Sequence, residues 1–477
     1  MDIYLSIDLG TTGCRSMLFD ENLNELAYSY EEYGLITLRE GWTEQDANLW
    51  WDITLKTAKD AINKSKINPL DIKSIAVSSQ GITIVPVDEK INPLRNAISW
   101  LDVRASEQTK KINEDFGDEL FKITGKDTLS KYTLPKLLWL KENEKDVYDK
   151  AYKFLMPCDF LVAKMTGNFV TENSMASGTL MFDLKNNVWF KEILDKYDID
   201  VNKLPSIANA TDCAGKVTSE FASFLGLSPD CRVAVSAQDQ KCASYGAGLK
   251  TDTMTVSLGT AAAVIKLWEG NPDYIKCGAG WCGYVEKDTV VSEGVIATAG
   301  TCLRYVRDTF FNGESYKIID KEAEESLLKG SSPIFLPYFG GASSPDYYPD
   351  STGVFYGITL STTRGDIALS VMEGVAFSLK NVLTAMKAYE SVDSLILFGG
   401  GAKGDLWSKI IAGATGLNVI TLESAEAAGA GAARIAAAAI GKTLPTLKQA
   451  KTFKPENTEY YEYKYQKFLE IEKKLFS

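Results

Sequence analysis

The chain contains no histidine among its 477 residues. This absence excludes Ser-His-Asp triads, histidine general acids and histidine metal ligands, so any proton transfer must fall to a carboxylate, a lysine, a tyrosine or a cysteine. Cysteine is present but scattered, with no C-x-x-C pair and no ligand cluster, which predicts reduced thiols in the core of a cytoplasmic protein. The eight thiols are Cys14, Cys158, Cys213, Cys231, Cys242, Cys277, Cys282 and Cys302.

Basic side chains are fewer than acidic ones. The 51 lysines and arginines against 63 aspartates and glutamates give a formal net charge of −12, with no basic run, so we expect no nucleic-acid partner. Residues 427–440 form a long run of small apolar side chains, but Arg434 interrupts it and its hydrophobicity is too weak to span a bilayer. We therefore expect a close-packed helix and no membrane partner. No basic leader or apolar signal core precedes the first predicted strand.

Two similar segments, about half a chain apart, organise what is present. Residues 4–13 form an apolar strand that breaks into Gly-Thr-Thr-Gly, and residues 253–260 form an apolar strand that breaks into Gly-Thr. Such a turn brings backbone N–H groups and hydroxyls together with no bulky side chain in the way, which is the composition of a phosphate-binding turn. Taken alone, each segment is also compatible with an ordinary turn.

The two turns differ at the strand end. Asp8 in the first could hold Mg²⁺ through water, whereas the second has Ser257 at the matching position. Two half-sites in two halves of a chain indicate a nucleotide clamped between two domains, and the length fits two domains. We place the boundary after Gly248, because the strand–turn pattern restarts there, so the predicted domains are 1–248 and 249–477.

A single carboxylate with amide side chains on either side follows another apolar strand. Residues 233–237 lead to Asp239, which lies between Gln238 and Gln240 at the start of a small-residue helix. Without histidine, a lone aspartate at a strand end is the natural candidate for a general base that accepts the proton of an attacking hydroxyl. The alternative is a helix N-cap, a position for which aspartate is favoured on its own account.

Other local patterns predict the elements around these residues. Glycines recur at 399–401, between a strand at 394–398 and a helix from about Asp405, which suits the close approach of a flat or phosphate-bearing ligand. Strands are also predicted at 15–20, 72–79, 83–88 and 97–104, and helices after a Thr43-x-x-Asp46 start, from about Ala105, at 136–143, from Pro157, and from about Pro455 to the C-terminus.

With these pieces in order, the chain resembles the FGGY carbohydrate kinases along nearly its whole length, including their xylulokinase-like and glycerol-kinase-like branches. The most specific match is the stretch 353–358, Gly-Val-Phe-Tyr-Gly-Ile, followed after seven residues by 366–373, which is similar to the family's C-terminal signature throughout. The N-terminal signature is matched except at Lys131, where the family usually has a small or aromatic residue. The matching positions are Thr133, Lys136, Leu137, Trp139 and Leu140.

The resemblance implies an α/β fold of duplicated actin-like, ribonuclease-H-type domains, with ATP and sugar meeting in the cleft between them. It implies that the N-terminal domain binds the sugar and carries the catalytic base, Asp239, and that the C-terminal domain binds the adenine nucleotide. The residues that match the family's nucleotide motifs are Asp8, Gly10, Thr11 and Thr12, then Gly259 and Thr260, then Gly300, and then Gly400, Gly401 and Ala402.

The implied sugar contacts lie at strand ends. Trp100 could lie against the carbon chain of the sugar while Asp102 or Arg104 bonds its hydroxyls, the alternative being a core tryptophan beside a local Asp102–Arg104 ion pair. Tyr132 belongs to the N-terminal signature. Ser79-Gln80-Gly81 stands where xylulokinases usually have Met-His-Gly, so a ring donor is replaced by an amide. The remaining implied contacts are Gln80, Gly81, Gln240 and Asp239 itself.

We therefore expect an ATP-dependent, Mg²⁺-dependent kinase for a hydroxyl of a small sugar or polyol, most readily a ketopentose such as xylulose. Family members are often dimers, which leaves a homodimer open. A rival hypothesis is an actin-like or chaperone-like ATPase whose nucleotide state switches a binding surface, since it would share both phosphate turns. A third is a silent sensor that binds sugar without transfer, which the presence of both Asp8 and Asp239 disfavours.

Overall fold

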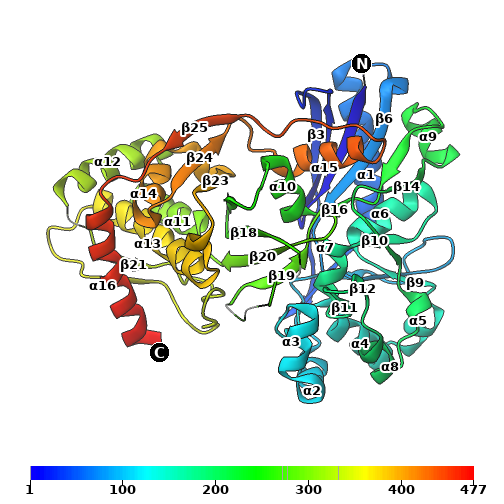
Figure 1. The fold of residues 1–477 in the computed structure, drawn as a ribbon, viewed down its shortest axis with the longest axis horizontal. Helices are drawn as coiled ribbons and strands as arrows, with labels where there is room; N and C mark the ends of the chain where they lie inside the picture. The colour runs from blue at the N-terminus through cyan, green and yellow to red at the C-terminus, as the bar shows by residue number, and fades with distance from the viewer. Residues whose placement is uncertain (1, 271, 275, 277, 331, 477) are drawn as a thin grey trace.

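The computed structural model describes residues 2–270, 272–274, 276, 278–330 and 332–476. They form two lobes that lie side by side, each built on a seven-stranded sheet (Figure 1). The first sheet has the order β14-β15-β6-β1-β2-β3, with β16 paired to β6, and the second has the order β19-β20-β18-β17-β23-β24-β25. The two-domain α/β fold expected from the resemblance is confirmed.

The strands of the first sheet are β1 (Ile3–Leu9), β2 (Gly13–Phe19), β3 (Glu25–Glu32), β6 (Ile72–Ser79), β14 (Cys213–Lys216), β15 (Arg232–Ala234) and β16 (Ala237–Gln238). Those of the second are β17 (Thr253–Leu258), β18 (Ala262–Glu269), β19 (Gly280–Gly283), β20 (Thr289–Ile296), β23 (Ser394–Phe398), β24 (Asn418–Leu422) and β25 (Gln449–Phe453). Short strands elsewhere are β4 (Ile36–Arg39), β5 (Trp42–Gln45), β7 (Val85–Val87), β8 (Ala97–Ile98), β9 (Lys153–Leu155), β10 (Val170–Glu172), β11 (Phe182–Asp183), β12 (Val188–Trp189), β13 (Ser206–Ala208), β21 (Ile334–Leu336) and β22 (Val354–Tyr356).

The helices of the first half are α1 (Ala47–Ser65), α2 (Ser106–Phe116), α3 (Asp118–Thr124), α4 (Thr133–Asn143), α5 (Lys145–Lys150), α6 (Pro157–Thr166), α7 (Asn173–Ala176), α8 (Lys191–Lys196), α9 (Ser219–Leu225) and α10 (Asp239–Ala247). Those of the second half are α11 (Gly300–Phe310), α12 (Tyr316–Lys329), α13 (Arg364–Ala385), α14 (Asp405–Thr415), α15 (Ala427–Ala438) and α16 (Thr458–Phe476).

The two sheets repeat one pattern of pairing. In the first, β1 pairs antiparallel with β2 and parallel with β6; in the second, β17 pairs antiparallel with β18 and parallel with β23. The next strand along each sheet is also antiparallel: β3 pairs with β2 in the first sheet, and β20 pairs with β18 in the second. The carboxyl ends of β1 and β17 therefore hold equivalent places in the two sheets, and each leads into one of the Gly-Thr turns.

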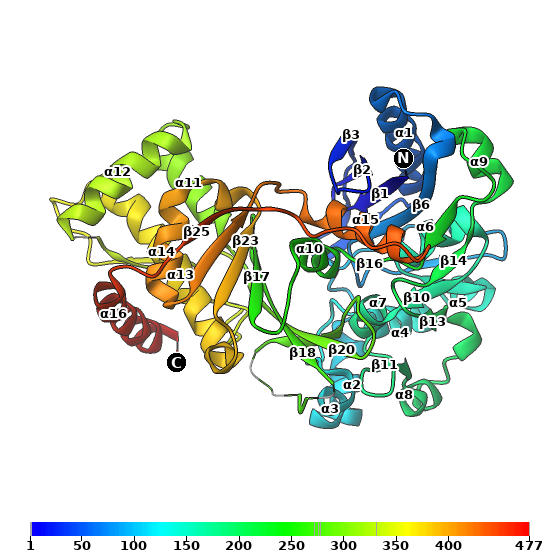
Figure 2. The ribbon, with the colours of Figure 1, turned by 45° about the horizontal axis from the view of Figure 1, so that its top comes forward.

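The alternation of side chains along β1 shows how the first sheet is covered. Ile3, Leu5 and the odd-numbered residues after them join the core beneath α1 and α6, whereas Tyr4 faces the opposite side. That opposite side is covered by α10 and by α15, a helix from the far end of the chain. Figures 1 and 2 both show α15 against the first sheet, from which the chain returns to the second lobe at β25.

Small residues let α15 approach closely. A Cβ atom on Gly431 would lie 1.8 Å from the carbonyl oxygen of Cys242, and one on Gly246 would lie 2.2 Å from that of Ala427, so α10 and α15 touch backbone to backbone. The hydroxyl of Ser74 on β6 donates to the carbonyl of Ala436 at 2.6 Å. The predicted close-packed helix at 427–440 is present, and it packs on the sheet of the other half of the chain.

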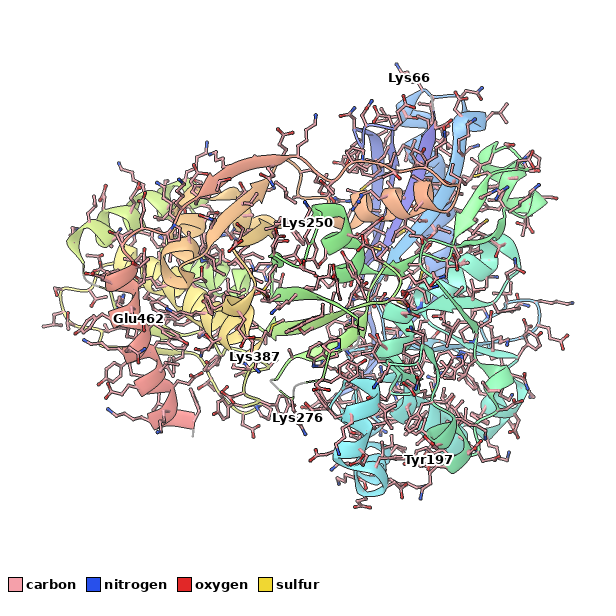
Figure 3. The ribbon with its side chains drawn as sticks, viewed as in Figure 1. Lys66, Tyr197, Lys250, Lys276, Lys387 and Glu462 are labelled. Atoms are coloured by element: carbon pink, nitrogen blue, oxygen red, sulfur yellow. The ribbon has the colours of Figure 1, made fainter. Side chains whose placement is uncertain are left out.

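The two halves meet again at the far edge of the second sheet. Trp281 N–H on β19 donates to the carbonyl of Gly125 at 2.9 Å. Lys276 forms ion pairs with Asp118 at 2.9 Å and Asp127 at 3.0 Å. Figure 3 labels Lys276 close to α3, and Lys250 where the chain passes between the lobes.

Several local predictions were wrong in detail. Thr43 lies in β5, and α1 is capped by Asp46, whose carboxylate accepts the N–H of Asn48. The strands predicted at 83–88 and 97–104 shrink to β7 and β8. Cys213 is exposed, whereas the other cysteines that the structure describes are buried; Cys277 lies outside the described residues. Within the described ranges, α13 alone is long and apolar enough to cross a membrane, but 83% of its apolar window is buried inside the protein, as in a core helix.

Candidate active site

Asp8 lies at the carboxyl end of β1 between two polar neighbours. In the pairing registers it stands opposite Ser78 of β6 and Arg15 of β2. The Ser78 hydroxyl donates to Asp8 Oδ1 at 2.7 Å, while Arg15 forms its ion pair with Glu426, just before α15. Burial raises the pKa of Asp8, and the Ser78 hydrogen bond and the Arg15 charge oppose that shift. The Asp8 carboxylate is thus largely desolvated and forms no ion pair among the residues that the structure describes.

The turn after β1 is held from several sides. Gly10 N–H donates to the carbonyl of Gly13 at 2.9 Å, and the amide of Gln45 donates to the carbonyl of Thr11 at 2.8 Å. The indole N–H of Trp100 donates to the Thr11 hydroxyl at 3.0 Å. Thr12 stays exposed. The turn is therefore rigid, with a hydroxyl on its open side.

The second turn has a helix N-terminus stacked on it. Gly300, the first residue of α11, donates its N–H to the carbonyl of Gly259 at 2.9 Å, and a Cβ atom there would lie 2.4 Å from that oxygen. Thr301 N–H donates to the carbonyl of Thr260 at 3.2 Å. The structure therefore brings together Gly259, Thr260 and Gly300, three residues for which the resemblance implies nucleotide contacts.

The third glycine segment lies beside the second turn. Gly399 has a φ of 93°, the left-handed region that favours glycine, and a Cβ on it would lie 2.8 Å from the carbonyl of Leu258. A Cβ on Gly401 would lie 2.5 Å from the Leu258 side chain. Gly400 is exposed, and Ala402 N–H donates to the carbonyl of Gly399 at 3.2 Å. The segment packs closely over the end of β17.

A backbone irregularity places Asp239 beside β6. Ser236 has a φ of 81° and interrupts the strand, and its hydroxyl accepts the N–H of Val77 at 2.8 Å. The chain resumes as β16, in which Ala237 pairs with Ser78 and Gln238 with Ser79. Asp239 therefore emerges next to Gln80, the residue that follows β6, and Ser78 of β6 holds Asp8. A left-handed serine here is a strained conformation that surrounding contacts must hold.

The N-cap alternative for Asp239 does not describe the geometry. Gln238 is the N-cap of α10, and its Oε1 accepts the N–H of Gln240 at 3.0 Å. Asp239 is the first helical residue, and its Oδ1 also accepts that N–H, at 2.7 Å. Burial is the largest cause that raises the pKa of Asp239 to about 7, and repulsion from Asp8 adds to it. A carboxylate poised near neutrality is suited to general-base chemistry.

A buried hydrogen-bond chain supports Gln238 from behind. Glu172 caps α7 by accepting the N–H groups of Ser174 and Met175, each at 2.7 Å, and also accepts the Ser174 hydroxyl. That hydroxyl accepts the N–H of Gln238 at 3.1 Å. Burial raises the pKa of Glu172 to about 7. Gln238, the residue just before Asp239, is therefore held in place by the Glu172 carboxylate through the Ser174 hydroxyl.

On the sugar side, Gln80 and Gly81 follow Ser79, which pairs with Gln238, the residue before Asp239. Gln80 is buried; its amide N–H donates to Gln45 at 3.1 Å, and its Oε1 has no partner among the described residues. A Cβ atom on Gly81 would lie 3.2 Å from the Gln238 side chain. Gln240 is partly buried within the first turn of α10. Gln80 thus carries an unsatisfied acceptor beside the candidate base.

Asp102 lies inside the protein. Its side chain is fully buried, forms an ion pair with Arg104 at 2.7 Å and accepts the N–H of Thr43 at 2.6 Å. Arg104 packs over the ring of Trp42 at 4.0 Å and pairs with Glu44 at 2.9 Å. The local ion pair, the alternative left open by the sequence, is the arrangement found. Asp102 offers no exposed oxygen to a sugar in this conformation.

Trp100 and Tyr132 are the two aromatic residues that the resemblance assigns to the sugar side. Trp100 is partly exposed, and its backbone N–H donates to the Thr83 hydroxyl at 3.0 Å. Tyr132 is mostly buried just before α4, with the Lys131 ammonium 5.5 Å from its ring centre. The hydroxyl of Thr133, next to Tyr132, donates to the carbonyl of Ile82 at 3.0 Å, so both residues lie near the segment that follows Gln80 and Gly81.

Comparisons with known proteins identify the family of the chain. The family model for the N-terminal domain of the FGGY family of carbohydrate kinases matches residues 3–246, and the model for its C-terminal domain matches residues 254–440. The chain belongs to the FGGY family of carbohydrate kinases. It is a phosphotransferase that acts on a hydroxyl group of a small-molecule sugar substrate, with ATP as the phosphoryl donor, so the predicted kinase activity is confirmed and the ATPase switch is not needed.

Relatives of this FGGY kinase cover its whole length. It is 30% identical over 463 residues to a xylulose kinase of Bacillus subtilis, with 97% of this chain and 93% of that protein covered. It is 31% identical over 475 residues to a xylulose kinase of Staphylococcus epidermidis, with 97% and 95% covered. Among solved structures, a xyloylose kinase from Brucella ovis is similar at a TM-score of 0.90 and 28% identity, with 99% of each chain covered.

Several polar residues of this FGGY kinase site were missed from the sequence. Ser78, two residues before Gln80 at the end of a predicted strand, could have been found from that position. Gln45, Glu172 and Ser174 act through contacts between segments far apart in the chain, and no local pattern signals them. The same holds for Lys241, whose partner Glu293 lies on a strand of the second lobe.

Proposed function

We propose that this FGGY kinase transfers the γ-phosphoryl group of ATP to a hydroxyl group of a ketopentose such as xylulose, with Asp239 as the general base. The observation that carries the proposal is the pairing of β16 with β6, which sets Asp239 beside Gln80 and near Asp8. The relatives at 30% and 31% identity are xylulose kinases, which favours that sugar. With a pKa of about 7, Asp239 is ionised in a large fraction of molecules near neutrality and accepts the hydroxyl proton as the oxygen attacks phosphorus.

The nucleotide is held by the glycine-rich strand ends. In this proposal the backbone of Gly10, with the hydroxyls of Thr11 and Thr12, cradles phosphate oxygens from the first lobe, and the turn that contains Gly259 and Thr260 does so from the second. Gly300, at the start of α11, supplies a helix N-terminus that favours negative charge. The adenosine lies against the close-packed glycine segment, which comprises Gly400, Gly401 and Ala402.

We also propose that Asp8 holds Mg²⁺ through water. The raised pKa of Asp8 marks a desolvated carboxylate without a paired cation, which suits a divalent ion. Within the described ranges no group of three or more acidic, cysteine or histidine side chains could ligate a metal, so phosphate and water oxygens would complete the coordination. When bound, the ion would neutralise charge on the transferring phosphoryl group.

The sugar side of the site is built on Gln80, Gly81, Trp100, Tyr132 and Gln240. Gln80 Oε1 is buried without a partner, so a substrate hydroxyl can satisfy it. Gly81 leaves room beside Gln238, and Trp100 offers an apolar ring face to the carbon chain. We assign Asp102 a supporting role, because its oxygens are engaged by Arg104 and Thr43.

The two halves divide this work, in our proposal, as domains 1–248 for sugar and base and 249–477 for nucleotide. The burial of most of the described thiols agrees with a cytoplasmic location for the enzyme. A homodimer stays a prediction, which light scattering on the purified chain would test.

A substrate panel tests the proposed function. ADP release from Mg²⁺-ATP should be stimulated most by a pentulose when pentuloses, hexuloses, pentitols, tetritols and glycerol are compared. Asp239→Asn should lower kcat by a factor of about 10² to 10⁴ and leave ATP affinity within about twofold. ADP release that no sugar stimulates would favour an ATPase switch, and unchanged turnover by Asp239→Asn would refute its role as base.

A further inference from the structure

A buried ion pair joins the two halves of the chain close to Asp239. Lys241, on α10 two residues after Asp239, lies 2.6 Å from Glu293 Oε2 on β20 of the second sheet. The lysine side chain is 3% exposed, whereas the glutamate side chain keeps 18% of its surface exposed. Burial alone would lower the pKa of Lys241, but Cys282 and Glu293 raise it overall; burial alone would raise the pKa of Glu293, but Lys241 and Lys126 lower it overall. The pair therefore presents a fixed, charged carboxylate at its open end.

Two further polar groups extend this feature. Cys282 Sγ on β19 lies 3.9 Å from Glu293 Oε2, and the buried ammonium of Lys126 lies 2.7 Å from the same sulfur. Gly280 stands opposite Glu293 in the sheet register, and a Cβ atom on it would lie 2.9 Å from the Lys126 ammonium. A glycine at this position thus leaves space for the cation. We call Lys126, Lys241, Cys282 and Glu293 the charged wall.

The charged wall lies next to the residues assigned to the sugar. Burial is the main cause that raises the pKa of Asp239 and that of Tyr132, and the charge of Glu293 adds to both shifts. The strand that carries Cys282 also packs on α7, because a Cβ atom on Gly283 would lie 2.3 Å from Asn173, the neighbour of Ser174 that holds Gln238. The charged wall is therefore close both to the candidate base and to Tyr132, and it approaches them from the second lobe.

We propose that the charged wall binds the hydroxyl groups of the sugar that lie away from the reacting one, and that Glu293 is a specificity-determining residue that selects a five-carbon sugar over a three-carbon polyol. The inference rests on the proposed function. With Asp239 bound to the reacting hydroxyl, the carbons beyond it need partners, and a carboxylate accepts two hydroxyl protons while an ammonium donates in return. A three-carbon acceptor has fewer hydroxyl groups to bond in this way.

The competing explanation is a purely structural contact that fastens the two lobes. A matched pair elsewhere separates the two explanations: Lys464 and Glu373 form a buried ion pair inside the second lobe, with side chains 8% and 1% exposed. Glu373→Gln breaks a pair of the same kind without touching the residues of the charged wall. It should lower the melting temperature and leave the KM values for sugar and ATP unchanged.

The test measures kcat and KM of Glu293→Gln with the sugar that the panel identifies, with glycerol and with ATP. We expect the KM for the five-carbon sugar to rise about tenfold or more, because a site built to bond hydroxyls loses its acceptor, while the KM for ATP stays within about twofold. Activity with glycerol should change far less. Glu293→Asp keeps the charge and should give an intermediate KM, and it serves as the second variant if Glu293→Gln fails to fold.

Three results would overturn the inference. One is a Glu293→Gln enzyme that behaves like Glu373→Gln, with reduced stability and an unchanged sugar KM. Another is an equal loss with glycerol and with the five-carbon sugar, and the third is a wild-type enzyme that phosphorylates glycerol alone. If the wild-type enzyme phosphorylates no sugar at all, the proposed function fails first, and direct binding of xylulose and glycerol to Glu293→Gln, measured by calorimetry, still decides the role of the charged wall.

Discussion

Replacing Asp239 with asparagine should inactivate the enzyme and also make its folded state more stable at alkaline pH. The substitution keeps the side-chain shape and leaves Oδ1 able to accept the N–H of Gln240. It removes a negative charge that lies in a desolvated place and is repelled by Asp8. The wild-type fold is therefore less stable than the fold with a neutral side chain at this position, where the reaction requires an ionisable group.

The size of the effect follows from the pKa. Burial and Asp8 raise the pKa of Asp239 from 3.8 to about 7, so the folded state keeps a proton that the unfolded chain releases. The charged carboxylate therefore destabilises the fold increasingly as pH rises from about 4 to about 7, and to a constant extent above that. A pKa difference of about three corresponds to about 4 kcal/mol, which we halve to about 2 kcal/mol because Asp239 is partly exposed and solvent screens it.

Thermal melting of wild type and Asp239→Asn across pH 6 to 8.5 measures this gain, well above the isoelectric point of about 4.9. For a chain of 477 residues, about 2 kcal/mol corresponds to a rise of about 2 °C in Tm at pH 8.5, with a smaller rise at pH 6. The kcat of wild type should fall as pH drops through about 7, because the base becomes protonated.

Asp159→Asn is the matched control. Burial also raises the pKa of Asp159 to about 7, but this carboxylate accepts the N–H of Met156 at the start of α6 and has no assigned contact with sugar or nucleotide. It should show a comparable pH-dependent gain in stability with turnover preserved. The reasoning is refuted if Asp239→Asn is less stable than wild type at pH 8.5, or if its gain does not depend on pH.

Two further predictions concern the support of the base and the metal. Ser174→Ala removes the acceptor of the Gln238 N–H, so it should lower kcat about tenfold, shift the acidic limb of the kcat–pH profile and leave the KM for ATP unchanged. Ser177 is a buried serine of the next turn, and Ser177→Ala should have none of these effects. Equal effects of the two variants would contradict a positioning role for Ser174. Asp8→Ala should cost far more activity than Ser257→Ala and weaken the response to Mg²⁺ titration, whereas equal losses would argue that the two turns share the metal.

The parts of the fold that the sequence predicted are those set by local pattern. The hairpin after Asp8, the helix from Asp405 and the C-terminal helix all follow from period and turn residues within one segment. Asp239 was found for the same reason, since a carboxylate directly after an apolar strand is visible without the partner strands. Gln80 was also found at a strand end, but its position beside Asp239 comes from the pairing of β16 with β6, which the sequence alone does not show.

The parts that could not be predicted depend on contacts between distant segments. Asp46 caps α1 in place of the predicted Thr43, because the residues before Asp46 pair as a strand with β4. Asp102 was assigned to the sugar by resemblance, but its neighbours bury it in a pair with Arg104. A serine does not predict a left-handed conformation, and Ser236 adopts one because hydrogen bonds from the surrounding fold impose it.

The position of α15 has a consequence for how the chain can be divided. A fragment that ended at Gly248 would keep the whole first sheet but would lack the helix that covers one of its faces, and would expose Met17, Ala76 and Cys242 to water. A second fragment from residue 249 onward would carry α15, an apolar helix between β24 and β25, without the sheet against which it packs. Neither half is therefore an autonomous folding unit despite their shared topology, and a split enzyme would recover its structure only when both pieces are present together.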